Sequence, residues 1–111
     1  TGISQCNYHL IFLQKAIRVD IEFARKDAVE NKLLFDFFYA RKQEIEAKFG
    51  HRMDWLRLDN KKSSRIEFSL LIEGHNQDLW QDYTAWHLEH IQKLEQAFKP
   101  YMKDAYEVIK N

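Results

Sequence analysis

The segment from Arg65 to Gly74 constrains the fold more than any other stretch, because apolar and polar residues alternate along it. Every second side chain of a β-strand points to the same face, so this period of two predicts a strand with one buried face. The apolar side carries Ile66, Phe68, Leu70 and Ile72, and the other side carries Arg65, Glu67, Ser69, Leu71 and Glu73. Such a strand requires neighbouring strands and a covering layer, which the rest of the chain must supply.

Three further strands and two helices are predicted from the remaining periodicity. Residues 8–13 and 18–23 form a first strand pair, and residues 53–58 pair with the strand at 65–74 across the turn DNKKSS. Helical spacing runs over residues 27–50, with Asp27 or Asn31 as the N-cap and Gly50 as the stop. It returns after Asn76, where Asp78 and Gln81 have N-cap and N3 spacing, and Pro100 should break this second helix.

The predicted order of elements is therefore ββαββα. It indicates an α+β two-layer sandwich, in which a four-stranded antiparallel sheet carries two helices on one face. A chain of 111 residues, of which 45% are hydrophobic, has room for one core, so residues 1–111 are predicted to form a single domain.

The composition excludes several classes of protein. Seventeen Lys and Arg residues balance seventeen Asp and Glu residues, so no overall basic excess favours nucleic acid. Cys6 is the only cysteine, which excludes an internal disulfide and a multi-cysteine zinc site. No apolar stretch is long enough to cross a bilayer, and no signal peptide is evident. We expect a cytoplasmic protein without membrane contact and, because the chain begins at Thr1, a fragment or C-terminal domain of a longer one.

A basic turn with a nearby tryptophan is the one candidate site for nucleic acid. The candidate binding residues are Trp55, Arg57, Lys61, Lys62 and Arg65. If Trp55, Arg57 and Arg65 share the uncovered face of the sheet, they could stack on and clamp a single strand. Acidic residues in the same two strands bring the net charge of this hairpin to zero, which also fits a solvated face with cross-strand ion pairs.

A two-layer fold leaves one face of its sheet uncovered, and apolar residues are expected there. The candidate interface residues are Tyr8, Leu10, Leu13 and Leu71, with Trp55 as a further member of the same surface. An uncovered aromatic sheet face invites a second subunit or a neighbouring domain. Protein contact is therefore the leading physical inference from the sequence.

No catalytic residue, metal site or cofactor is predicted. His87 and His90 lie near each other on a helix, but their order differs from the His-Glu-x-x-His pattern and no third ligand is evident. Asp36 lies among apolar residues, but Lys32, four residues earlier, could pair with it. Cys6 would need activation by a nearby base to act as a nucleophile, and it lies in the N-terminal segment, which is expected to fray. A small enzyme using His87, His90 and Asp36 is thus the weakest of the alternatives, and no small-molecule substrate is inferred.

The chain resembles a known family, the domain of unknown function 4268, over roughly residues 8–105. The residues that carry the resemblance are Asn31-Lys32, Phe35-Asp36, Lys42, Ile45-Glu46, Phe49-Gly50, Trp55, Arg57-Leu58, Ser64-Arg65-Ile66, Trp80, Trp86, Leu94, Phe98 and Pro100. In longer members this domain follows a part similar to the PD-(D/E)xK nucleases. The resemblance implies an association with DNA-handling or defence proteins, and it implies no catalytic residues.

Together these observations predict a non-enzymatic accessory domain that associates with a copy of itself or docks to a neighbouring domain, which the resemblance implies is nuclease-like. The alternative is a nucleic-acid-binding module that uses the outer sheet face.

Overall fold

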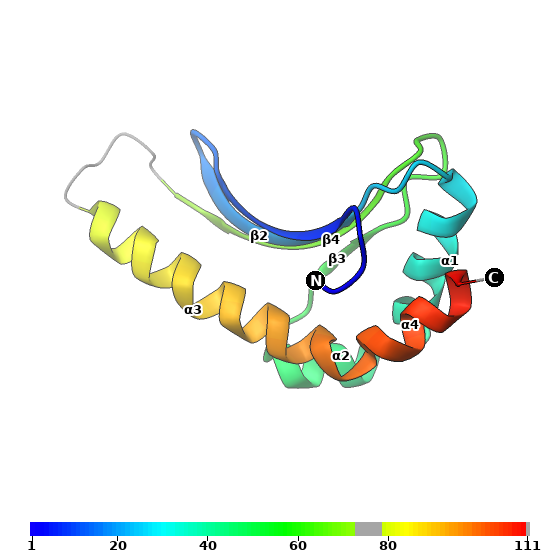
Figure 1. The fold of residues 1–111 in the computed structure, drawn as a ribbon. Coiled ribbons are helices and arrows are strands. Elements are labelled where there is room, and N and C mark those ends of the chain that lie inside the picture. The colour runs from blue at the N-terminus through cyan, green and yellow to red at the C-terminus, as the bar shows by residue number, and fades with distance from the viewer. Residues whose placement is uncertain (73–78, 111) are drawn as a thin grey trace.

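The computed structural model describes residues 1–72 and 79–110, and it confirms the predicted α+β class (Figure 1). In chain order the elements are β1 (Cys6–Phe12), β2 (Ala16–Phe23), α1 (Ala28–Tyr39), α2 (Lys42–Phe49), β3 (Asp54–Leu56), β4 (Ser64–Leu71), α3 (Trp80–Phe98), the 3-10 turn η2 (Lys99–Tyr101) and α4 (Met102–Ile109). The predicted order ββαββα is kept, with the first helix divided into α1 and α2 and the second followed by α4.

The four strands form one antiparallel sheet in the order β1-β2-β4-β3. Residues directly opposite each other in an antiparallel sheet project from the same face. Ile21 on β2 lies opposite Tyr8 on β1 and Ile66 on β4, and all three belong to the helix-covered inner face. The register gives that face the residues Cys6, Tyr8, Leu10, Phe12, Ile17, Val19, Ile21, Phe23, Trp55, Ser64, Ile66, Phe68 and Leu70.

The alternate residues form the outer face, which no described helix covers (Figure 1). They are Asn7, His9, Ile11, Ala16, Arg18, Asp20, Glu22, Asp54, Leu56, Arg65, Glu67, Ser69 and Leu71. Figure 1 shows that the sheet is strongly curved, with the helices around its convex side and its concave side open. The two-layer arrangement therefore matches the prediction. The residues on the open side determine what that side of the sheet can bind.

The first helix is two helices rather than the single helix predicted over residues 27–50. Asp27 caps α1 as expected, because its side chain accepts a hydrogen bond from the Val29 N–H at 2.8 Å. The Arg41 N–H donates to the Phe38 carbonyl, three residues back, which tightens and ends the last turn. The break lets α1 pack against α4 and α2 against α3. Gly50 ends α2 with φ of 98°, which confirms the predicted stop.

The helix predicted after Asn76 breaks at Pro100, as expected. α3 ends at Phe98, Pro100 lies in the turn η2, and α4 begins at Met102. The predicted N-cap Asp78 lies outside the described residues, and α3 begins at Trp80. No helix in the described ranges is both long enough and apolar enough to span a membrane.

The predicted strand over residues 53–58 is only three residues long, from Asp54 to Leu56. Leu58 has φ of 57°, a left-handed conformation that no strand residue adopts, so the chain turns away from the sheet there. The short β3 leaves Ser69 and Leu71 on β4 without a strand partner on that side, within the described part of the chain.

Cys6 is fully buried on the inner face, and burial raises the pKa of its thiol to about 11. Above pH 9.0, the ordinary value, the unfolded thiol loses its proton while the folded one keeps it, so stability falls as pH rises. Between about pH 8 and about pH 10.5 we expect the parent to lose about 2 kcal/mol more unfolding free energy than Cys6→Ala. Urea unfolding at both pH values measures this difference, and equal losses would contradict it.

Candidate functional site

The structure does not bring the five predicted nucleic-acid-binding residues onto one surface. Trp55 lies on the inner face, where its ring packs edge-on against Phe35 with 6.2 Å between centroids. Its indole Nε1 donates a hydrogen bond to Glu46 Oε2 at 3.0 Å. The prediction that Trp55 lies on the open face beside Arg57 and Arg65 is therefore wrong. Both faces of residues 53–58 carry large side chains, so their pattern did not indicate which face meets the core.

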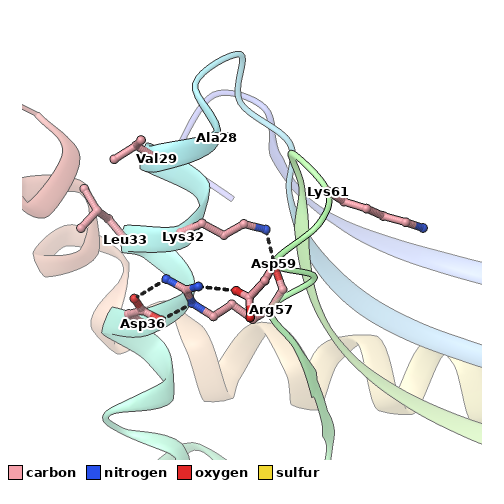
Figure 2. Close-up of a pocket in the computed structure, with 8 residues that line it drawn as sticks. All are labelled: Ala28, Val29, Lys32, Leu33, Asp36, Arg57, Asp59 and Lys61. Atoms are coloured by element: carbon pink, nitrogen blue, oxygen red, sulfur yellow. Dashed lines mark hydrogen bonds and ion pairs between the residues drawn. The ribbon is translucent and has the colours of Figure 1, made fainter.

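Arg57 lies just beyond β3 and is held by two carboxylates (Figure 2). Its Nε and Nη2 donate to the two Asp36 oxygens at 2.9 and 3.1 Å, and its Nη1 donates to Asp59. These hydrogen bonds raise the pKa of Arg57 further above its ordinary value. Lys61 and Lys62 are exposed in the β3–β4 loop, and Figure 2 shows Lys61 pointing away from the Arg57 cluster. Only the two loop lysines remain as exposed positive charge in this group.

Arg65 is on the outer face as predicted, within a network of ion pairs. Arg65 Nε lies 2.9 Å from Glu67, and Arg18 bridges Glu67 at 3.5 Å and Asp20 at 3.2 Å. His9 Nδ1 contacts the second Asp20 oxygen at 2.9 Å. Asp20 and Glu67 are buried and lie opposite each other on β2 and β4, and Arg18 contacts both carboxylates. The middle of the outer face is therefore a neutralised polar surface, which agrees with the alternative of cross-strand ion pairs.

Lys32 on α1 holds the β3–β4 loop, a role that the sequence interpretation missed. Its ammonium donates to the carbonyls of Arg57, Leu58 and Ser63 at 2.5, 2.8 and 2.7 Å. It also contacts the Ser64 hydroxyl at 2.9 Å, and that hydroxyl donates to the Arg57 carbonyl. Lys32 was instead predicted to pair with an acidic residue one turn along the helix. Its position beside Asn31 in the family resemblance was the available signal that it has a larger role.

The surroundings of Lys32 favour a structural rather than a chemical role. Loss of hydration lowers the pKa of Lys32 from its ordinary value, an effect that the Asp59 carboxylate opposes. An ammonium has three protons, and here all of them face protein oxygens, so no proton or lone pair is left for a substrate. The adjoining cavity of about 360 Å³ is open (Figure 2), and it is lined by Ala28, Val29, Lys32, Leu33, Asp36, Arg57, Asp59 and Lys61.

Asn31 and Asp36, the other residues singled out on this helix, join α1 to neighbouring segments. Asn31 is buried and does not cap a helix. Its side chain accepts from the Arg25 N–H at 2.9 Å and donates to the carbonyls of Arg25 and Lys62 at 3.0 and 2.9 Å. Asp36 pairs with Arg57 rather than with the predicted Lys32. Five residues of the resemblance, Asn31, Lys32, Asp36, Arg57 and Ser64, thus meet at the junction of α1 with the β3–β4 loop.

The histidines and the cysteine considered for catalysis are in separate structural contacts. His87 Nε2 donates to the Ile11 carbonyl at 3.2 Å. His90 is buried, stacks on Trp86 at 4.2 Å between centroids and donates from Nδ1 to the Trp86 carbonyl. Cys6 lies in the core. Among the described residues, no three His, Cys, Asp or Glu side chains are grouped as a metal site would require.

The four predicted interface residues divide between the two faces. Tyr8 and Leu10 are on the inner face, so the expectation that they lie on the open face is wrong. Leu71 is on the outer face, as predicted, and 84% of its side chain is exposed. Leu13 and Leu71 flank Ala16 from its two sides: the Leu13 N–H donates to the Ala16 carbonyl, and Ala16 pairs with Leu71. Residues 8–13 are apolar on both sides, so only pairing with β2 decided their orientation.

Exposed apolar side chains gather at the end of the molecule formed by the β1–β2 turn, the end of β4 and the start of α3. We call this group the hairpin-end cluster: Phe12, Leu13, Leu70, Leu71 and Leu79. The ring centroids of Phe12 and Tyr83 lie 6.1 Å apart. A cavity of about 460 Å³ lies beside the cluster and is lined by Leu70, Leu71, Ile72, Leu79 and Tyr83.

Comparison with known proteins gives one match. A family model described as Domain of unknown function (DUF4268) matches residues 1–102. No curated protein and no solved structure matches the chain. The match covers the sheet, α1, α2, α3 and the junction around Lys32, and its description assigns no activity.

Proposed function

The chain belongs to the DUF4268 family, and we propose that it is a non-enzymatic assembly domain, which binds a second copy of itself or a neighbouring protein domain through the hairpin-end cluster. The observation that carries this proposal is that three exposed leucines of the cluster, Leu70, Leu71 and Leu79, line one apolar cavity at the end of the sheet where Phe12 and Leu13 are also exposed. Contiguous exposed apolar surface is typical of protein-binding sites.

The contacts of the basic residues favour protein over nucleic acid as the partner. Single-stranded nucleic acid is bound by exposed aromatic rings and by cations free to meet phosphates. Trp55 is instead packed against core rings, and the guanidinium groups of Arg57 and Arg65 meet carboxylates. The overall charge of zero adds no general attraction for phosphate.

The proposed absence of catalysis is supported by the engagement of each candidate group. Lys32, His87 and His90 all donate to backbone carbonyls of the same chain. The protons of the Lys32 ammonium all face oxygens of its own chain, and His90 is buried in a stack with Trp86, so neither group is presented to a substrate. Catalysis by a longer protein would then belong to another of its domains.

We expect the parent chain to self-associate at tens of micromolar and the Leu71→Glu variant to lose this association by about tenfold or more. Leu71 is 84% exposed, so the change places a charge in the cluster without disturbing the core. Sedimentation velocity from about 5 to about 300 µM measures the mass against 13.5 kDa for one chain. Val29→Glu is the matched control, because Val29 is 64% exposed on α1, at the other end of the molecule (Figure 1).

Two results would contradict the proposal in part. One is a parent chain that stays monomeric over the whole range, which would exclude self-association and leave docking to a neighbouring domain. The other is retention on single-stranded DNA that falls steeply as salt rises, which would favour the nucleic-acid alternative. Equal loss of association in Leu71→Glu and Val29→Glu would remove the hairpin-end cluster from the proposal.

A further inference from the structure

The two edges of the sheet differ in how far they are open to another strand. β3 has three residues, and the chain after it turns away at Leu58. β1 has seven residues and pairs only with β2 among the described strands. Sheet edges expose unpaired N–H and C=O groups, and natural proteins protect them with charges, prolines, bulges or short strands. β1 contains no Lys, Arg, Asp, Glu or Pro between Cys6 and Phe12.

The backbone groups that β1 turns outward follow from its hydrogen bonds to β2. The N–H groups of Leu13 and Ala24 donate to the carbonyls of Ala16 and Gln5, so the odd-numbered residues of this segment bond towards β2. Bonding direction alternates along an antiparallel strand, so the even-numbered residues point away from β2.

The N-terminal segment occupies one end of this free edge. The Cys6 N–H donates to the Ile3 carbonyl at 3.1 Å, and the Cys6 carbonyl accepts from the Thr1 hydroxyl at 2.6 Å. The outward groups of Tyr8, Leu10 and Phe12 have no such partner among the described residues. The open part of the edge is therefore a run of three outward-facing residues with Leu10 at its centre.

The side chains of these three residues are also incompletely covered. Tyr8 is partly buried, whereas Leu10 and Phe12 are 48% and 51% exposed, although all three project from the inner face. The helices thus cover the inner face of β2 fully and leave the β1 margin of the inner face open. A further strand alongside β1 would extend the sheet and carry its own apolar side chains onto this margin.

From this edge we infer that β1 pairs antiparallel with β1 of a second copy, centred on Leu10, to form one continuous eight-stranded sheet. The inference rests on the self-association of the proposed function, names a second copy as the partner, and extends the contact from Phe12 and Leu13 of the hairpin-end cluster along the β1 edge. Tyr8 would lie opposite Phe12 of the partner subunit, and Leu10 opposite Leu10 of the partner subunit. Each pair exchanges two backbone hydrogen bonds, giving about six in all.

A second copy is the occupant that this edge fits, because the open run is complementary to itself. A two-fold axis at Leu10 sets an aromatic residue opposite an aromatic residue and leucine opposite leucine, with no charge on either strand. Rotation about His9 would instead need the Cys6 groups that Ile3 and Thr1 already occupy, and it would set two histidines face to face. The hairpin-end cluster adjoins the same edge through Phe12 and Leu13, which would add apolar contact.

Disulfide formation between introduced cysteines tests both the edge and the register. On the outer face, the proposed pairing sets Asn7 opposite Leu13 of the partner subunit, with about 4.5 Å between Cα atoms. That separation permits a disulfide. With Cys6→Ala in every protein, we expect an equal mixture of Asn7→Cys and Leu13→Cys to form about tenfold more disulfide-linked dimer under mild oxidation than either variant alone.

The second variant set serves as an independent check and a control. Leu10→Cys in the Cys6→Ala background should cross-link to itself, whereas Val29→Cys, which is exposed on α1, should stay monomeric. A parent that dimerises in sedimentation without either β1 cross-link would overturn this pairing and leave the proposed function standing. A parent that remains monomeric would overturn both this pairing and the proposed self-association.

Discussion

The Lys32→Met variant is expected to lose about 3 kcal/mol of unfolding free energy. Methionine keeps the length and apolar stem of the side chain and removes the ammonium, so the carbonyls of Leu58 and Ser63 lose a charged donor. The Ser63 carbonyl would have no other partner among the described contacts, and an unpaired carbonyl at a partly buried site costs more than the average hydrogen bond contributes. The left-handed Leu58 keeps the bond that closes its turn, because its carbonyl also accepts from the Lys61 N–H at 2.8 Å. Urea unfolding monitored by circular dichroism measures the change.

Lys61→Met is the matched control for this prediction. Lys61 lies in the same β3–β4 loop, but it is exposed and makes no contact comparable to those of Lys32. A surface substitution of this kind should change the unfolding free energy by about 0.5 kcal/mol or less. If the two methionine variants were equally stable, Lys32 would not be the residue that holds the loop, and its four short contacts would carry little energy.

Phe38→Ala should lose about 4 kcal/mol, the largest effect expected for a single substitution in this chain. Phe38 has no exposed surface, and its ring meets Phe23 of β2 at 5.6 Å and Phe98 of α3 at 5.1 Å. The side chain therefore joins α1 to both the sheet and α3. Alanine would leave a cavity that the surrounding rings cannot fill without moving, which adds to the lost burial of the ring.

Leu33→Ala on the same helix is the matched control, because it makes a substitution to alanine on α1 that removes little buried surface. Leu33 is 41% exposed, so its truncation should cost about 1 kcal/mol or less. Chemical unfolding of parent, Phe38→Ala and Leu33→Ala under one set of conditions gives the comparison. Similar losses in the two variants would mean that Phe38 is not the packing centre that its ring contacts indicate. Neither residue belongs to the hairpin-end cluster, so folded variants should still self-associate.

Much of the secondary structure could be predicted because its signals act between near neighbours. The alternation from Ile66 to Leu70 became β4, Gly50 ended a helix with a positive φ, and Pro100 separated α3 from α4. Each of these outcomes depends on backbone sterics or on the direction of successive side chains. Such signals are present in any chain that contains the same few residues in the same order.

The orientation of β1 and β3 could not be predicted in this way. Tyr8 and Leu10 belong to a segment that is apolar on both sides, and Trp55 belongs to one that is large on both sides. Their faces were decided by pairing with strands whose alternation is clear, since Tyr8 lies opposite Ile21 and Trp55 opposite Ile66. A shift of one residue in either pairing would have exchanged the two faces.

The junction around Lys32 shows the same limit for polar residues. The spacing of Lys32 and Asp36 fits a pair on one helix, which is worth a few tenths of a kcal/mol. In the folded chain Lys32 meets the carbonyls of a loop, and Asp36 meets the forked guanidinium of Arg57. Both partners lie more than twenty residues away, so no local pattern indicated them.

What the sequence determined by itself is the type and order of the elements, the buried sides of β2 and β4 and the balance of charge. What only the tertiary structure decided is which apolar residues stay uncovered and which strand edge stays open. The physical reason is that periodicity records whether a side chain meets a core, whereas the covering element is set by contacts between distant segments. The surface proposed to bind a partner consists of those residues that the folded chain does not cover.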